Sequence, residues 1–293
     1  MKRTLVMAWC MVCLGWLAMS GQESTAQPQL FTYPVAPDTC STLESRCNYV
    51  IQHFWDDFDI SRRIDDAAAL EKTFRDYVDL MPHTHRNILQ SSIRNLVFKA
   101  QSNNSNLIKI AQLAEITLYG PNAEFWSDEI YVYFVQPLLQ VKQLPKEMRQ
   151  HYSDQLKRIN LNIEGNVMDF EYTDASGRTR RLSDTSANSY VILLTDDNIN
   201  SSIARTRLGT DVGLNAAIDS GYVQVIDIDL EKSSQAWQQR AAGYPSNWIN
   251  GCSESLLKTI DLRVIPSCYI LDENRRIVSK NVLVDRIKNA FVR

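Results

Sequence analysis

Apolar residues recur at three- and four-residue spacing through the first half of the chain. The pattern is clearest over 43–58 and 67–81, where it predicts two helices, and Pro82 ends the second. The preceding segment, 27–37, is rich in proline and aperiodic, so we predict an extended leader there. This half is therefore predicted to be all-helical. Further helices are predicted at 86–101, 105–118, 128–141 and 145–160.

After residue 160 the pattern changes to alternation and to short continuous apolar runs, which are typical of strands. Strands and helices then alternate, which indicates an α/β layer structure with a partly parallel sheet. We place the domain boundary near residue 161, with a helical domain over 27–160 and an α/β domain over 161–293. Gly209 and Gly213 are weak points in one predicted helix. Strands are predicted at 165–173, 190–194, 223–228, 268–271 and 276–280, and helices at 201–218, 233–242 and 284–291.

The first 26 residues have the order of a secretory signal peptide. Lys2 and Arg3 precede an apolar run over 5–19, and a small, polar stretch follows. The run spans about 22 Å as a helix, which is short of a ~30 Å hydrocarbon core. Cleavage after Ser20 or after Ala26 fits the small residues nearby, and we favour Ala26. Cys10 follows Trp9 and Cys13 follows Val12, where a lipobox has a small residue, so we expect a periplasmic or otherwise exported protein without stable membrane insertion.

Composition adds little beyond excluding some partners. The chain has 293 residues, 44% of them hydrophobic, with a net charge of -3. Such a balance offers no basic face for nucleic acid, so we expect no nucleic-acid partner. His83 and His85 follow Pro82 in a polar stretch, which we interpret as a loop and not as a metal site. We expect no metal and no cofactor.

Four cysteines remain after removal of the signal, in two pairs that are close in sequence. Disulfides persist in an exported protein, and four cysteines allow three pairings. Local pairing would join Cys40 to Cys47 and Cys252 to Cys268. Seven residues along one helix span about 10.5 Å, so the first pair requires Cys40 to lie before the helix. Unpaired thiols are the alternative.

Four motifs, in order, resemble a family of exported two-part proteins from Gram-negative gut anaerobes of the Bacteroidetes type. Such proteins join a helical domain of unknown function to a TlpA-like thioredoxin-fold domain. The resemblance implies that Pro266, preceded by Ile265, is a cis-proline beside the site where active relatives carry a dithiol. The motifs are HFWDDFD at 53–59, GNVMDF at 165–170, WING at 248–251 and IPSCYILDENRRI at 265–277.

The sequence departs from this family at the reactive turn. Active relatives have an acidic turn followed by Cys-x-x-Cys at the start of a helix, where the helix N-terminus favours a thiolate. Here the corresponding stretch is TDDNINSS at 195–202, which places Ile199 and Ser202 in the two cysteine positions. Isoleucine has no nucleophile, and a serine without a neighbouring base is unreactive. We therefore name no catalytic residue and interpret the active site as degenerate.

Three functions are compatible with this interpretation. The first is a non-catalytic module that binds an unidentified protein or peptide in the groove beside Pro266. The second is a thiol-disulfide oxidoreductase that uses Cys252 and Cys268 as a displaced pair. The third is a ligand-binding protein whose site lies between the two domains. The first is favoured because the fold signals remain while the reactive cysteines do not.

Overall fold

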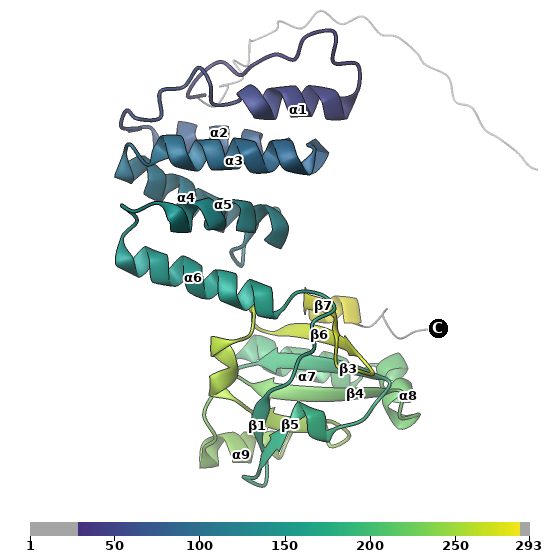
Figure 1. Cartoon of the computed structure of the whole chain (residues 1–293). Coiled ribbons are helices and arrows are strands. Elements are labelled where there is room, and N and C mark those ends of the chain that lie inside the picture. Colours follow the sequence, from purple (N-terminus) through teal and green to yellow (C-terminus); the bar gives the residue numbers. More distant parts are fainter. Residues whose placement is uncertain (1–28, 288–293) are drawn as a thin grey trace, which may run out of the picture.

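The computed structural model describes residues 29–287, with a stack of helices above an α/β unit (Figure 1). Both parts agree with the sequence patterns. The six helices of the stack end at Leu161. Pro82 lies in a short 3-10 helix, η1 (Met81–His83), that directly follows the second helix. The helices are α1 (Leu43–His53), α2 (Ala67–Asp79), α3 (Arg86–Ala100), α4 (Asn104–Leu118), α5 (Asp128–Gln140) and α6 (Lys146–Leu161).

Side-chain caps fix where several of these helices begin. Thr42 forms a capping box with Ser45 at α1, and Asp66 accepts from the Ala69 N–H at the start of α2. Ser127 caps α5 in the same way. Each cap satisfies an N–H that the helix leaves without an intrahelical partner.

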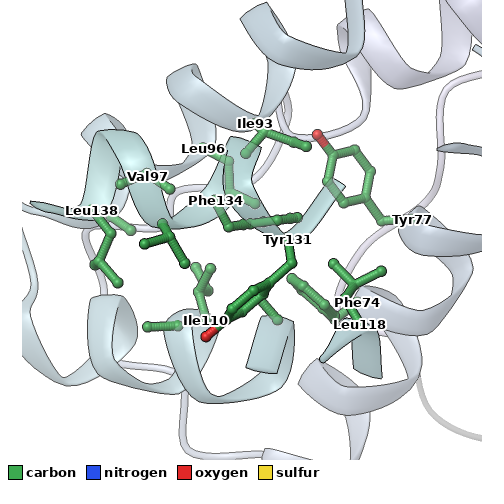
Figure 2. Packing of buried hydrophobic residues seen from close by; sticks show 14 of the residues in the cluster. Phe74, Tyr77, Ile93, Leu96, Val97, Ile110, Leu118, Tyr131, Phe134 and Leu138 are labelled. Atoms are coloured by element: carbon green, nitrogen blue, oxygen red, sulfur yellow. The ribbon is translucent and has the colours of Figure 1, made fainter. Parts of the chain in front are cut away.

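One apolar core runs through the helical stack. Tyr131, Phe134 and Leu138 recur on one side of α5 and are buried. Figure 2 shows them packed among side chains of the neighbouring helices, including Phe74 of α2 and Ile93 of α3. The apolar spacing seen in the sequence is thus the side of each helix that faces its neighbours.

The described part of the leader, residues 29–37, has no helix or strand and is anchored to the helical core by aromatic rings. Phe31 stacks on Phe58, with ring centroids 5.1 Å apart, and lies 5.5 Å from the ring of Trp55. Tyr33 donates a hydrogen bond to Asp76 of α2, and burial raises the pKa of the Tyr33 phenol to about 12. The leader therefore contributes to the core although it has no regular structure.

The α/β half contains a seven-stranded mixed sheet in the order β2-β1-β5-β4-β3-β6-β7. The three strands β3, β4 and β5 are parallel, and the remaining pairings are antiparallel. The strands are β1 (Glu171–Asp174), β2 (Thr179–Arg181), β3 (Ser189–Thr195), β4 (Val223–Asp229), β5 (Ile249–Cys252), β6 (Ser267–Asp272) and β7 (Ile277–Val282).

Helices lie on one face of this sheet, over buried side chains such as Val191, Leu193 and Val225. The opposite face holds a second core around Ile192, Ile226 and other buried side chains. The helices are α7 (Ile199–Gly209), α8 (Val212–Asp219), α9 (Gln235–Ala241) and α10 (Val284–Ile287), and the 3-10 helices are η2 (Leu182–Asp184) and η3 (Glu254–Lys258).

The structure corrects several predicted boundaries in this half. The single helix predicted at 201–218 is two helices, because α7 ends at Gly209 and Asp211 caps a new helix by accepting from the Leu214 N–H. The strand predicted at 165–173 is reduced to an isolated bridge at Val167 and then β1. Strands β2 and β5 were not predicted, since both are short, β2 is polar and β5 has no apolar run.

Within residues 29–287, the helices are all too short or too polar to cross a bilayer. The predicted signal peptide, with its cleavage sites after Ser20 and Ala26, lies outside the described residues. So does the end of the helix predicted at 284–291.

Candidate functional site

The degenerate turn lies at the carboxyl end of β3, where α7 begins. Asn198 caps α7 by accepting from the Ser201 N–H at 2.9 Å. The buried Ser201 hydroxyl donates to Asp196 at 2.8 Å and accepts from the Asp196 N–H at 3.2 Å. The turn is therefore held rigidly by short-range polar contacts, independently of any cysteine.

Ile199 and Ser202 lie in the first turn of α7. The Ile199 side chain is 71% exposed, and Ile203, one turn later, is 42% exposed. Ser202 is exposed, and its hydroxyl donates to the carbonyl of Asn198 at 3.3 Å. No base contacts Ser202 among the described residues, so this turn has no activated nucleophile, and its exposed groups include the Asp197 carboxylate as well as Ile199.

Pro266 lies at the same end of the sheet. β6 pairs antiparallel with β3 so that Ser267 is opposite Leu194, and Pro266 directly precedes this pair. The Ile265–Pro266 peptide bond is cis, and both residues are partly exposed. Within the described part of the chain, the N–H and C=O groups of Ile265 make no hydrogen bond. An extended segment could pair with them there.

A buried charge network lies directly beneath the turn, and we call it the Arg205 network. Arg205 points from α7 toward β4, where its guanidinium bonds Asp227 at 2.5 Å and also pairs with Asp229. The Thr195 hydroxyl contacts both carboxylates, at 2.8 and 2.9 Å. The three charged side chains are at most 7% exposed. Such a group is stable only while each charge keeps its partner.

Two aromatic residues complete the Arg205 network. The Trp237 indole donates to Asp229 at 2.7 Å, and the Tyr244 hydroxyl donates to the same oxygen at 3.0 Å. The Arg205 guanidinium lies 3.9 Å from the centre of the Tyr244 ring. Burial raises the pKa of Asp227 to about 6, against the opposing effect of Arg205.

The sequence analysis did not identify this network, although a signal was present. Asp227 and Asp229 alternate at the end of a strand that is apolar apart from Gln224, so both must point to the same face of a buried sheet. Buried acids require partners. The only missing information was that Arg205 lies across from them.

A cavity of about 590 Å³ opens beside the turn, between α7 and the loop that precedes β5. Its walls carry hydroxyl, amide and guanidinium groups together with the Tyr244 ring. Ser202, one of the degenerate positions, contributes to its edge. The cavity is lined by Ser202, Arg205, Thr206, Gly209, Thr210, Asn215, Arg240, Gly243, Tyr244, Pro245, Ser246 and Asn247.

The structure contradicts the expected pairing of Cys252 with Cys268. Cys252 is on β5 and Cys268 on β6, and β4 and β3 lie between them. Three strand spacings amount to about 14 Å, twice the ~7 Å limit for bridging two Cα atoms. Both thiols are free and buried. Burial raises the pKa of Cys252 to about 11 and that of Cys268 further, so neither favours the thiolate. The displaced redox pair is therefore not formed.

Cys40 and Cys47 are free as well. Cys40 precedes α1, as a local disulfide would require. Cys47, however, is packed into the core on the buried side of the helix with Ile51, where burial raises the pKa of its thiol. The four cysteines thus make no disulfide in this structure.

Comparisons with known proteins match both halves. Residues 18–162 match the model of a domain of unknown function, DUF5106. The crystal structure of a thioredoxin-like protein from Bacteroides caccae ATCC 43185 is similar over 90% of this chain and 98% of that chain, with a TM-score of 0.75 and 21% identity. This likeness shows the fold. No curated protein matches the chain.

Shorter structures align with 44% of the chain. One is the C-terminal domain of an uncharacterized protein from Bacteroides fragilis NCTC 9343, with 97% of that chain covered, 20% identity and a TM-score of 0.41. Another is the thioredoxin domain of a thiol-disulfide oxidoreductase from Bacteroides vulgatus, with 99% covered, 15% identity and a TM-score of 0.38. The predicted fold class is confirmed: the chain joins a helical region, which matches DUF5106, to a domain with a thioredoxin-like fold.

Proposed function

We propose that this chain, a DUF5106 region joined to a thioredoxin-like domain, is a non-catalytic binding module. In this proposal it holds an extended peptide or partner strand in the groove beside Pro266, without thiol-disulfide exchange. The observation that carries the proposal is the main chain of Ile265, which makes no hydrogen bond to described residues and lies at the same end of the sheet as the exposed Ile199.

The chemistry at the turn opposes exchange. Exchange begins when a thiolate attacks a disulfide sulfur. Ile199 and Ser202 supply no sulfur, and Cys252 and Cys268 are buried three strand spacings apart. The purified protein should therefore fail to reduce insulin disulfides. Reduction that disappears in Cys252→Ser or Cys268→Ser would favour the oxidoreductase instead.

The surface at the turn favours binding. An extended segment gains main-chain hydrogen bonds by pairing with an exposed edge, and pockets for its side chains add specificity. Ile265 offers one donor and one acceptor, while Ile199 and Ile203 offer exposed apolar area on α7, which begins at the same end of the sheet.

Tethering a peptide at the turn tests the groove directly. In Ile199→Cys with Cys40→Ser, the introduced thiol would exchange with oxidised 2-mercaptoethanol or with an oxidised, end-blocked heptapeptide that has one central cysteine. A groove that holds the peptide should make its mixed disulfide at least fivefold more stable than that of 2-mercaptoethanol. The control peptide is N-methylated at alternate amides, which removes donors worth about 1 kcal/mol each.

Two outcomes of this experiment oppose the proposal. Equal stability for the peptide and for 2-mercaptoethanol would mean that the groove holds nothing. A preference that survives N-methylation would mean that side chains alone retain the peptide, so the main chain of Ile265 is not the binding edge.

We also propose that the protein acts in the periplasm. The support is the charged, apolar and small-polar order of residues 1–26. Mass spectrometry of the native protein should find a mature N-terminus at Gly21 or Gln27. A native chain that retains Met1 would refute export by this signal.

A further inference from the structure

The helical half contacts the thioredoxin-like half close to the groove. Tyr119 is the C-cap residue that follows α4, and Asp128 is the first residue of α5. Both reach the segment 261–263, which lies just before Pro266 in the chain, and Asp128 also reaches Lys280 on β7. We call the cluster of Tyr119, Asp128, Asp261, Arg263 and Lys280 the junction clasp.

The junction clasp is a compact set of charged and hydroxyl groups. The Tyr119 hydroxyl donates to Asp261 at 2.7 Å, and Lys280 lies 2.5 Å from a carboxylate oxygen of both Asp128 and Asp261. Arg263 pairs with Asp128, and its guanidinium lies 4.5 Å from the centre of the Tyr119 ring. Side chains of the two halves thus contact one another directly in the junction clasp.

Burial makes the partners of the junction clasp interdependent. The side chains of Asp261 and Arg263 are 0% and 4% exposed, and that of Lys280 is 13% exposed. Two carboxylates face two cations. Neutralising Asp128 would leave Arg263 and Lys280 with Asp261 alone, so one positive charge would be buried without a partner.

The clasp also fixes the main chain that leads to Pro266. The Arg263 N–H donates to Asn281 at 3.2 Å, and the carbonyl of Asp261 accepts from Asn281 and from Tyr269. β6 holds the chain again from Ser267 onward. Between these anchors, Ile265 makes no main-chain hydrogen bond to described residues. Its position therefore depends on where the two anchors are held.

We infer that Tyr119 and Asp128, residues of the helical half, are positioning residues for the groove beside Pro266. The inference rests on the proposed function, because the groove is the site that they position. They act through Arg263 and Asp261 and do not touch the bound segment. The helical half thereby determines the position of the Ile265 N–H and C=O groups.

The first measurement is hydrogen exchange in the full chain. Tyr119→Phe and Asp128→Asn should each speed exchange over 261–268 at least tenfold while leaving β3 unchanged. Matched controls make the same chemical changes elsewhere: Tyr133→Phe removes a hydroxyl that bonds Glu129 on α5, and Asp285→Asn removes an exposed partner of Arg207. Equal acceleration in β3, or none at 261–268, would overturn the inference.

The second measurement separates positioning from a merely structural role. In the Ile199→Cys, Cys40→Ser background, Tyr119→Phe and Asp128→Asn should lower the preference for the heptapeptide over 2-mercaptoethanol at least threefold. The equilibrium constant for forming the mixed disulfide with 2-mercaptoethanol should not change, because that thiol does not occupy the groove.

The two ideas fail in different ways. A parent protein without any preference for the peptide refutes the binding groove, and the positioning inference with it. A clear preference that neither Tyr119→Phe nor Asp128→Asn reduces refutes the positioning inference alone and leaves the groove intact.

Discussion

Replacing Arg205 by methionine should destabilise the thioredoxin-like half severely. Arg205 is 6% exposed and lies between two carboxylates that are each 1% exposed. Methionine keeps much of the apolar stem but removes the charge, so Asp227 and Asp229 would face each other without a cation. Breaking a buried ion pair by removing one partner costs about 3–5 kcal/mol.

Arg207 provides a matched control on the same helix. It pairs with Asp285 at 2.9 Å, but the two side chains are 53% and 71% exposed. An exposed pair contributes about 0–1 kcal/mol, so Arg207→Met should cost at most about 1 kcal/mol. The two substitutions are chemically identical, and burial is the main difference between their sites.

The cost at Arg205 should also depend on pH. The pKa of Asp227 is raised to about 6 from 3.8, so the folded state binds this proton more tightly than the unfolded state. The contribution of Asp227 to the free energy of unfolding is therefore fully present below about pH 4, and it is lost as the pH rises through 6. Without Arg205 the pKa of Asp227 rises further. Acidification from pH 8 to pH 5.5 should then restore at least about 1 kcal/mol more in the variant than in the wild type.

Urea unfolding, together with hydrogen exchange measured in β3 and β4, would give the free energy of unfolding of the thioredoxin-like half. In the same half, polar partners hold the pKa values of Asp169 and Asp174 below their usual range, so these two carboxylates stay ionised between pH 8 and pH 5.5. Asp227→Asn added to Arg205→Met should recover part of the loss, since one uncompensated charge disappears. A loss no larger than that of Arg207→Met, or a loss equal at both pH values, would refute this reasoning.

Three further predictions concern the turn, the sheet and the leader. Ile199→Cys with Ser202→Cys should yield a thiol whose pKa, measured by thiolate absorbance, lies below the usual ~8.5, because it lies in the first turn of α7. Thiols with an unshifted pKa in a folded protein would mean that the lost site is misplaced. Gly251→Ala should cost about 1–3 kcal/mol in urea unfolding, because its Cβ would collide with the Tyr172 ring, whereas Gly120→Ala meets only ordinary contacts; similar costs would contradict this. Phe31→Ala should lower the free energy of unfolding of the helical half by about 1–3 kcal/mol through lost aromatic packing. Val35 is 85% exposed, so Val35→Ala should lower it by less than about 0.5 kcal/mol, and an equal effect of the two would show that the leader is not part of the core.

The sequence predicted the elements that carry their own periodic signal. Helices of the first half were predicted because each has an apolar side, as Tyr131, Phe134 and Leu138 illustrate in α5. The buried strands β3 and β4 were predicted because continuous apolar runs are typical of strands covered on both faces. β2 and β5 were missed because pairing with neighbours, more than composition, makes them strands.

At the site, the sequence alone determined which chemistry is missing. Ile199 and Ser202 have no thiol, and this holds for any fold of the chain. What only the tertiary structure decided is which side chains meet. Cys252 and Cys268 are near in sequence but three strand spacings apart, while Arg205 meets Asp227 and Asp229 from a different element. The order of strands in a sheet sets such contacts, and that order arises from long-range pairing that no local pattern encodes.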